Sequence, residues 1–444
     1  MLTNYFKLAL KVLGRNKFFT AISLFGISFT LLILMLITAI YDAEFGTNAP
    51  LTDKDRMVFL GSLKLELVNP DTIWTIDSTQ MDGQMAYDST YTIGENVSST
   101  SISQFSYDFV TKHLDDVETS DNHTFFSGGH SFDVFLDNRK LTIEALYVDD
   151  RYWQLFDFYF QEGDPFTSGH VRDATPVAVI TSDLANRYFG DSNDALGKEI
   201  ELGSRRYRVI GMVEQARTTS DFVSSDVYLP VTTMDARDLE DTGFHGSMAG
   251  VYLAADRADI PLIKEEVANK VSSVTYPNPE DYNRVSTIPM NIGEMYASMI
   301  IDQNDPEGGL FFVRLVFGVL LLFFVLLPTL NLINMNLSRI MEREAEIGVR
   351  KAFGAHSGTI LYQFVFENVI ITFIGGVIGM VLAMLVLYLI NDSEILPQLI
   401  LRFNGTVFLY SIVICLLFGI ISGLLPAWKV SRLQIADVLK SNQL

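Results

Sequence analysis

The sequence predicts an α-helical membrane domain of four transmembrane helices, with a large α+β extracytoplasmic domain inserted between the first and second helices. Two observations lead to this prediction. Hydrophobic residues make up 49% of the 444 residues, and yet the formal net charge is −21. Four long runs contain no charged residue, and nearly all of the acidic excess lies in the single segment between the first two runs.

The uncharged runs cover residues 18–41, 315–338, 368–391 and 403–428. Roughly 20 helical residues cross the hydrocarbon core of a bilayer, so each run is long enough to span it. The first run follows several basic residues, as the core of a signal peptide does. However, it is too long for a signal core and no small-residue cleavage site follows it, so we expect a retained signal anchor.

Basic residues indicate the orientation of the chain. Residues 1–17 carry four Lys or Arg and no acid, residues 339–351 carry four, and the tail after residue 428 carries three, whereas residues 392–402 carry one. Because Lys and Arg are enriched in cytoplasmic loops, both termini and the middle loop are expected in the cytoplasm. Residues 41–309 then lie outside, with 19 basic and 46 acidic residues.

The predicted order of segments follows from these runs. Residues 1–17 have an apolar face and a basic face, which suits a helix lying on the inner leaflet, although a basic tail that only fixes topology is the alternative. The expected segments are an amphipathic N-terminal helix (1–17), transmembrane helix 1 (18–41), the extracytoplasmic domain (42–309), transmembrane helix 2 (310–338), a cytoplasmic loop (339–357), transmembrane helix 3 (358–391), an external loop (392–402), transmembrane helix 4 (403–428) and a cytoplasmic tail (429–444).

The external segment mixes strand and helix patterns, which predicts an α+β domain. Residues 102–114 have apolar residues at helical spacing and are expected to form an amphipathic helix. Residues 69–100 are rich in Ser, Thr, Asp and Gly, and fit either a small inserted subdomain or a long loop. The one cysteine, Cys415, lies in the fourth apolar run, so no intrachain disulfide supports this domain. Strands are expected at 56–60, 64–68, 132–136, 141–148, 176–181, 198–202, 207–213, 226–230 and 251–254, and further helices at 184–189 and 260–271.

Three stretches carry a family resemblance. Residues 148–213 contain Val-Asp-Asp-Arg-Tyr-Trp, Glu-Gly-Asp-Pro-Phe, Pro-Val-Ala-Val-Ile and Leu-Gly-Lys-Glu-Ile, and end in Tyr-Arg-Val-Ile-Gly-Met-Val. This run resembles the periplasmic core domain of MacB/FtsX-type ABC transporter permeases. Residues 343–355 resemble that family's coupling loop, and residues 426–431, Pro-Ala-Trp-Lys-Val-Ser, resemble its C-terminal signature. The resemblance covers nearly the whole chain and implies a four-helix permease with a MacB-like domain at residues 42–309.

The cytoplasmic loop has the sharpest pattern. Charged residues recur every three or four positions, so a helix leaving the membrane would carry both signs on one face, with pairs such as Glu346 and Arg350. The charge pattern alone fits a solvated turn equally well, but the resemblance implies docking into a groove of a separate ATP-binding subunit. The residues expected to couple to that ATPase are Arg339, Glu342, Arg343, Glu344, Glu346, Ile347, Arg350, Lys351 and Gly354.

Small and amide side chains indicate how the membrane helices pack. Asn331 and Asn334 share one helical face near Pro328, and buried amides in a membrane need partners, so static helix–helix contacts are favoured over a substrate contact. Small residues four apart permit close helix approach. The residues of this kind are Gly375 and Gly379 in the third run and Gly419 and Gly423 in the fourth.

Catalytic machinery is not expected in this chain. It has no Walker A sequence, its six histidines have no metal-ligand spacing, and no Gly-x-Ser-x-Gly elbow occurs. We therefore expect no catalytic residue, no metal ligand and no cofactor bound by this chain, with ATP and Mg²⁺ bound by the partner ATPase.

The expected function is that of a permease subunit, in a bacterial inner membrane, which couples ATP hydrolysis by a separate ATPase to rearrangement of the external domain. The cargo would be periplasmic or membrane-derived, such as an antimicrobial, a peptide or a lipoprotein. The alternative is an FtsX-like regulatory protein that controls an external partner such as a cell-wall hydrolase. Expected partners are the ATPase, a second permease copy or a paralogue, membrane lipid and, in an efflux system, a periplasmic adaptor and an outer-membrane channel, but no nucleic acid.

Overall fold

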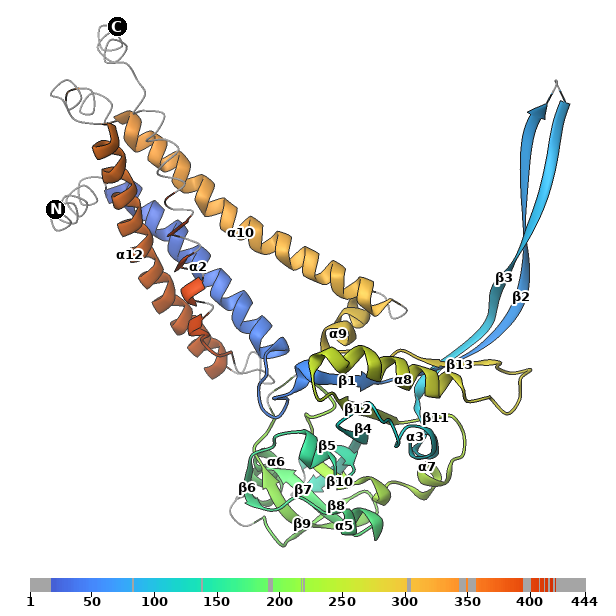
Figure 1. Ribbon diagram of the computed structural model, residues 1–444. Coiled ribbons are helices and arrows are strands. Elements are labelled where there is room, and N and C mark those ends of the chain that lie inside the picture. Colours follow the sequence, from blue (N-terminus) through green and yellow to red (C-terminus); the bar gives the residue numbers. More distant parts are fainter. Residues whose placement is uncertain are drawn as a thin grey trace. The chain divides into compact units, whose positions relative to one another are not determined.

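The computed structural model contains two compact units, Met1–Gly46 with Phe311–Leu444, and Thr47–Leu310. The first unit contains long apolar helices and the second is an α+β domain (Figure 1). The structure describes residues 17–81, 84–136, 139–190, 195–216, 218, 220–301, 305–342, 349, 357–393, 401–406, 408–410, 412–413, 416–417 and 420.

Three described helices are long and apolar enough to cross a membrane. They are α2 (Lys17–Phe45), α10 (Pro306–Glu342) and α12 (Ser357–Asp392), with candidate spans at Thr20–Ala43, Pro306–Phe324 and Val365–Asp392. Most of the fourth predicted helix, residues 403–428, lies outside the described residues, as do residues 1–16 of the predicted N-terminal helix. The structure therefore supports three of the four predicted spans and does not test the fourth.

The α+β domain is built on one mixed sheet. Its strands follow the order β13-β2-β3-β12-β4-β5-β10-β7-β9-β6, with β1 beside β12, β11 beside β3 and β8 beside β9. The pairs β10–β5 and β7–β9 are parallel. The strands are β1 (Met57–Leu60), β2 (Leu63–Met81), β3 (Gln84–Phe105), β4 (Asn122–Leu136), β5 (Arg139–Val148), β6 (Phe160–Gly163), β7 (Val177–Thr181), β8 (Glu199–Leu202), β9 (Arg205–Val213), β10 (Val227–Pro230), β11 (His245–Gly246), β12 (Met248–Leu253) and β13 (Arg284–Thr287).

The central strands are buried on both faces, which explains their continuous apolar runs. In β7, Ala178 and Ile180 belong to one hydrophobic core and Val177 and Val179 to the other. Helices α3 (Tyr107–His113), α6 (Ser182–Phe189) and α8 (Ile260–Ser272) contribute to the first core, and α4 (Tyr152–Leu155) and α9 (Ile292–Ile300) to the second. The remaining helices are α5 (Ser168–Arg172), α7 (Ala236–Glu240) and the 3₁₀ turns η1 (Lys54–Arg56), η3 (Val231–Thr233) and η4 (Arg257–Asp259).

The helix predicted at residues 102–114 is partly wrong. Residues up to Phe105 are the end of β3, and α3 begins only at Tyr107. The reason is the local cap: the Ser106 side chain accepts a hydrogen bond from the Phe109 backbone N–H at 3.1 Å. A serine at this position satisfies an N–H that has no partner within the helix, so it fixes where α3 begins.

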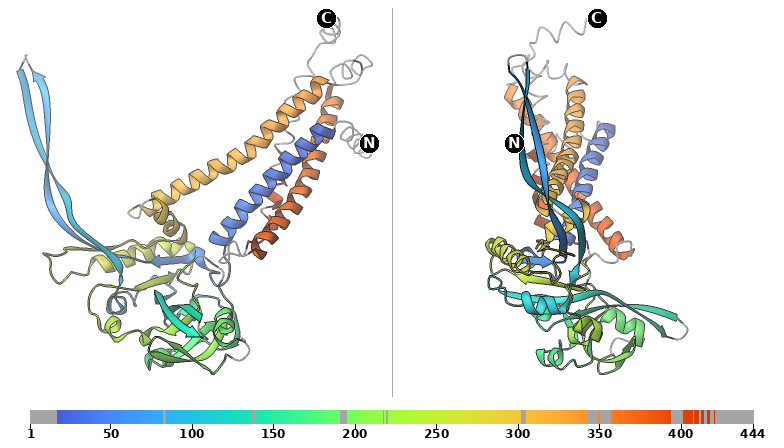
Figure 2. Two further views of the ribbon diagram at one scale, coloured as in Figure 1. Left: turned by 180° about the vertical axis from the view of Figure 1, so that it is seen from behind. Right: turned by 90° about the vertical axis from the view of Figure 1, so that its right-hand side faces the viewer.

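The undecided segment at residues 69–100 is neither a loop nor a subdomain. Strands β2 and β3 pair antiparallel from Leu63 opposite Ser103 to Met81 opposite Gln84, with one register shift at Leu67/Val68. The two strands form a twisted ribbon that extends away from the body of the α+β domain in every view (Figures 1 and 2).

Two side chains of the Val-Asp-Asp-Arg-Tyr-Trp motif, Asp149 and Arg151, join neighbouring segments of the domain. The buried Asp149 carboxylate accepts hydrogen bonds from the backbone N–H groups of Phe125 and Tyr152, at 3.2 and 3.0 Å, and from the side chain of Thr124. Arg151 donates to Asp149 at 3.3 Å and to Asp115 at 2.7 Å. These contacts join β4, the end of β5 and α4, so the motif has a structural role.

Candidate transmission site along the α9–α10 junction and the membrane helices

An ion pair joins α9 to the core of the α+β domain. Lys264 of α8 pairs with Glu294 of α9, and the two side chains are 17% and 7% exposed. The Glu294 carboxylate also accepts the Asn291 N–H at 2.9 Å, while the Asn291 side chain accepts the Glu294 N–H at 3.0 Å. This reciprocal capping box fixes the beginning of α9. Glu294 thus links the start of α9 to a helix whose apolar side packs on the sheet.

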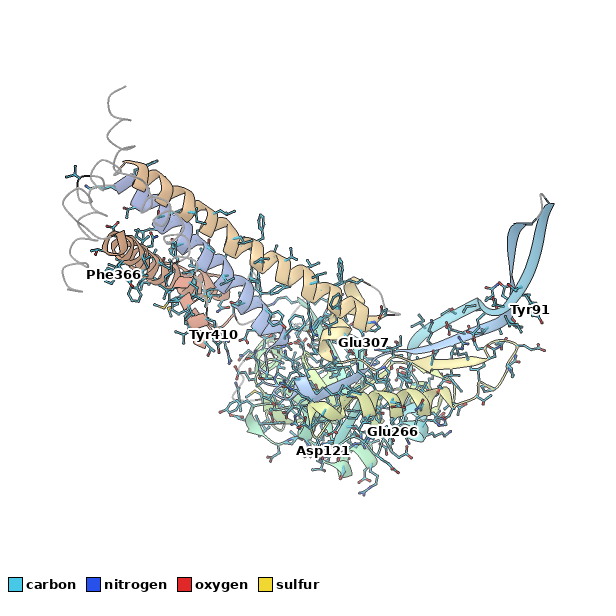
Figure 3. The ribbon with its side chains drawn as sticks, turned by 45° about the horizontal axis from the view of Figure 1, so that its top comes forward. Tyr91, Asp121, Glu266, Glu307, Phe366 and Tyr410 are labelled. Carbon is cyan, nitrogen blue, oxygen red and sulfur yellow. The ribbon has the colours of Figure 1, made fainter. Side chains whose placement is uncertain are left out.

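The first turn of α10 lies against α9. A Cβ atom at Gly293 would lie 3.1 Å from the Leu310 side chain, and one at Gly309 would lie 3.6 Å from Ala297. The Asp305 side chain accepts the Gly308 N–H at 2.9 Å and so caps α10. Glu307, in the same turn, lies 3.9 Å from the Lys264 amine and is labelled in Figure 3. Small residues thus allow α9 and α10 to approach closely, and Lys264 lies near acids of both helices.

Helix α10 continues from this junction without a break. It contains 37 residues and remains helical through Pro328. At a rise of 1.5 Å per residue its length is about 55 Å, which exceeds the hydrocarbon core of a bilayer. Its last described residues, Arg339 to Glu342, are the first residues of the predicted cytoplasmic loop. A single helix therefore connects the α9 junction to the predicted coupling segment.

Helices α2 and α12 pack through small residues. A Cβ atom at Gly375 would lie 2.8 Å from the Ile27 side chain, and one at Gly379 would lie 2.9 Å from the Ser28 carbonyl oxygen. Both distances are too short for a side chain, so only glycine permits this approach. Around them Ile27, Leu31, Ile370 and Ile371 form a buried cluster.

The end of α12 is tied to the chain that follows. The Asn391 side chain donates to the Leu401 carbonyl oxygen and accepts the Leu401 N–H, both at 3.0 Å. Leu401 packs with Ala39 and Leu387 in a second buried cluster. At the other end of α12, Glu367 and Asn368 are each only 5% exposed. The structure thus places both polar side chains inside the helical unit.

Two family models match the chain. The model described as MacB-like periplasmic core domain matches residues 20–270, and the one described as FtsX-like permease C-terminal matches residues 318–435. This chain belongs to the MacB/FtsX family of ABC transporter permeases. The resemblance noted in the sequence is therefore confirmed, and the two matches leave only 47 intervening residues, which contain α9 and the start of α10.

Curated relatives share low identity with this family member. The macrolide export ATP-binding/permease protein MacB of Acinetobacter baylyi is 25% identical over 287 residues, which are 64% of this chain and 40% of that protein. The pyoverdine export ATP-binding/permease protein PvdT of Pseudomonas savastanoi is 26% identical over 297 residues, 66% and 42% of the two chains. The chain thus spans less than half the length of these relatives, whose names combine ATP binding with a permease.

Solved structures match parts of the chain. The periplasmic region of MacB from Actinobacillus actinomycetemcomitans is 14% identical, with a TM-score of 0.30, and covers 42% of this chain and 97% of that one. A domain of a permease protein from Porphyromonas gingivalis is 16% identical, with a TM-score of 0.35, and covers 54% and 92%.

The residues predicted to couple to an ATPase lie at the edge of the described part of the chain. Arg339 and Glu342 belong to the last turn of α10, and the exposed Val349 is the one described residue of 343–356. Asn331 and Asn334 lie within α10, and the structure describes their backbone but not their side chains. Residues outside the described part are Arg343, Glu344, Glu346, Ile347, Arg350, Lys351, Gly354, Gly419 and Gly423.

The residues that join the core of the α+β domain to α9 and the first turn of α10 were not predicted from the sequence. Asn291-x-x-Glu294 has the pattern of a capping box and could have been found by that signal. Lys264 could not, because nothing in its helix indicates a partner 30 residues away. Among the described residues, no group of three or more His, Cys, Asp or Glu is arranged to hold a metal ion.

Proposed function

We propose that this chain is the permease subunit of a MacB-like ABC transporter in a bacterial inner membrane. ATP and Mg²⁺ bind to a separate ATPase subunit, which docks on residues 339–357. The resulting movement passes through α10 to the α+β domain, which lies outside the cytoplasm, while both termini lie inside. The working unit contains a second permease, either a copy or a paralogue. Relatives named for macrolide and pyoverdine export favour export of a cargo taken from the periplasm or the membrane.

The observation that supports this proposal is the continuity of α10. One end of the helix lies against α9, which the Lys264–Glu294 pair ties to the domain core, and the other end enters the charged segment predicted to dock the ATPase. A helix transmits displacement along its axis because its backbone hydrogen bonds resist extension. Movement of the cytoplasmic end would therefore reach the domain with little loss.

The test is a charge reversal in the predicted coupling segment. Glu346→Lys with Arg350→Glu exchanges the two signs while keeping the net charge. We expect it to abolish copurification with the cognate ATPase and the stimulation of ATP hydrolysis, because both partner contacts become repulsive. Unchanged association and stimulation would contradict the coupling assignment.

The control is a charge reversal on the side of the membrane predicted to be opposite the coupling segment. Arg402 is exposed and belongs to the predicted external loop. Arg402→Glu reverses one charge on the same chain without touching residues 339–357. ATPase binding by this variant should equal that of the wild type.

A further inference from the structure

A cleft of about 430 Å³ lies in the α+β domain, where strands β4 and β5, the β8–β9 turn and η3 meet. Helix α7 contributes one residue to its wall. Small-molecule sites in proteins commonly have volumes of about 300–1,000 Å³, so the cleft suits a compact ligand. Its wall is mostly polar, which favours a ligand that carries charges or forms hydrogen bonds.

The backbone around the cleft contains two glycines with positive φ, a conformation that other residues rarely adopt. Gly129 has a φ of 77° and lies at the register shift of β4 between Ser127 and His130. Gly203 has a φ of 61°, and a Cβ atom there would lie 3.3 Å from the Phe132 ring. Bulges re-aim side chains and are over-represented next to active sites. The two glycines thus shape the wall of the cleft.

The buried side of the cleft is aromatic and neutral. The His130 ring lies edge-on to Tyr147, with centroids 4.9 Å apart, and its Nε2 atom lies 2.8 Å from the Ser127 hydroxyl oxygen. Tyr147 is only 6% exposed. Burial lowers the pKa of His130, although two nearby aspartates act in the opposite direction. The ring is therefore neutral at pH 7 and adds no charge to the cleft.

Three charged side chains line the cleft, and none of them forms an ion pair with another described residue. Arg205 donates to the Thr233 carbonyl oxygen at 2.5 Å, which holds its guanidinium beside η3. Asp235 and Asp238 form no side-chain hydrogen bond within the described part of the chain. Burial raises the pKa of Tyr147, and Asp235 adds to this rise while Arg205 opposes it. Charges of both signs therefore act on the same hydroxyl group.

The unpaired charges indicate the chemistry of a ligand that would complement them. An arginine guanidinium binds a carboxylate through two parallel hydrogen bonds. Each aspartate can accept hydrogen bonds from an ammonium or guanidinium group. A simple anion would leave both aspartates unpaired, and a simple diamine would leave Arg205 unpaired. A ligand with one carboxylate and two cationic nitrogens would neutralise all three side chains.

We propose that this cleft binds a small zwitterion with one carboxylate and two cationic nitrogens, the chemistry of a free basic amino acid such as lysine or of a basic dipeptide. The carboxylate binds Arg205, the cationic nitrogens bind Asp235 and Asp238, and the methylene chain lies on the aromatic side. No residue of α9 or α10 lines the cleft, so the site is separate from the proposed transmission path. The proposal relies on the proposed function only for the side of the membrane on which the ligand is found.

The test measures binding to the full chain in phosphatidylcholine nanodiscs by isothermal titration calorimetry. The probes are L-lysine, glycyl-L-lysine, L-norleucine, which lacks the side-chain amine, and cadaverine, which lacks the carboxylate. We expect lysine or glycyl-lysine to bind at least about tenfold more tightly than norleucine and cadaverine, and the tighter of the two identifies the source. Equal affinity for all four probes, or no binding, would overturn the proposal. No ATPase is present, so failure here leaves the coupling experiment unaffected.

A variant of the cation tests the carboxylate contact. Arg205→Gln should weaken lysine binding about tenfold and leave cadaverine binding unchanged, because cadaverine has no carboxylate. The matched control is Arg206→Gln, since Arg206 is the next residue, does not line the cleft and pairs with Glu201 at 3.2 Å. This control should bind lysine as the wild type does.

Variants of the acids test the contacts with the cationic nitrogens. Asp235→Asn with Asp238→Asn should weaken lysine and cadaverine alike, by about tenfold. Neither aspartate side chain has a bond to lose among the described residues, so this variant decides the proposal even if Arg205→Gln disturbs η3. Glu240→Gln with Glu265→Gln removes two exposed acids outside the cleft and should preserve lysine binding. If the cleft variants and the controls bind lysine alike, the ligand is bound elsewhere and the assignment is wrong.

Discussion

Lys264 and Glu294 are the residues on which the attachment of α9 depends most. The carboxylate is nearly inaccessible, and Lys264 is its cationic partner in the described contacts. Burying a charge is costly, and removing one member of a buried pair leaves the other uncompensated. The pair therefore holds α9 in one position against α8 only while both members are present.

Lys264→Met should destabilise the α8–α9 contact by about 3 kcal/mol, because it leaves the Glu294 carboxylate buried without its cation. The measurement is amide hydrogen exchange of residues 291–300 in the full chain, which should become faster. Adding Glu294→Gln should restore much of the protection, since Gln remains able to accept the Asn291 N–H and carries no charge. Protection that is unchanged in the Lys264 variant would show that packing alone fixes α9.

Lys270 provides the control within the same helix. It pairs with Asp116 at 2.9 Å, and the Asp116 side chain is 80% exposed. Exposed pairs contribute little because water and salt screen them. Lys270→Met should therefore leave exchange at α9 as in the wild type.

At the scale of elements, the sequence predicted most of the α+β domain and failed where periodicity is ambiguous. Strands such as β7, β9 and β10 and helix α8 agree with the prediction, because strand alternation, long apolar runs and helical spacing mark them clearly. Ile102, Phe105 and Phe109 fit a helical spacing as well as the end of β3 followed by a capped helix. The β2–β3 ribbon was missed because its alternating polar and apolar residues are interrupted by Ser and Thr throughout, which is also typical of loops.

For the long apolar helices, too, the sequence predicted some features and not others. The long uncharged runs predicted α2, α10 and α12, since hydropathy over about 20 residues is a strong signal. The small-residue spacing of Gly375 and Gly379 indicated close packing, but it did not indicate which helix would be the neighbour. The identity of the neighbouring helix depends on tertiary contacts, and in the structure α2 packs against both glycines.

Gly379→Val should separate α2 from α12. The new side chain would meet the Ser28 carbonyl at 2.9 Å and Leu31 at 3.0 Å, and such overpacking typically costs about 1–3 kcal/mol. We expect a lower unfolding temperature of the full chain in detergent. Gly318→Val in α10 is the matched control, because nothing lies within 4 Å of a Cβ atom there. Equal effects of the two variants would mean that helix propensity, and not the α2–α12 contact, sets the cost.

In the molecule as a whole, α10 is the helix that has residues in both compact units. Its first turn lies in the Thr47–Leu310 unit and the rest in the helical unit. The gap between the two family matches, residues 271–317, also contains its beginning. The chain passes between the two units twice, after α2 at Gly46–Thr47 and within α10 at Leu310–Phe311, and only the second crossing lies inside a helix. If the two units move together during ATP hydrolysis, α10 is the helical path for that movement.

Breaking the continuity of α10 should separate ATPase binding from the response of the α+β domain. Four glycines inserted after Leu315 would make the helix locally flexible, since glycine costs about 1 kcal/mol per residue in a helix interior. Four alanines at the same place keep the helix intact and only shift it by about 6 Å and rotate it by about 40°. The glycine variant should still copurify with the ATPase but lose the ATP-dependent change in fluorescence between dyes on the domain and on α12. The alanine variant should retain a measurable change. A glycine variant that responds as strongly as the wild type would show that movement reaches the domain by a route other than α10.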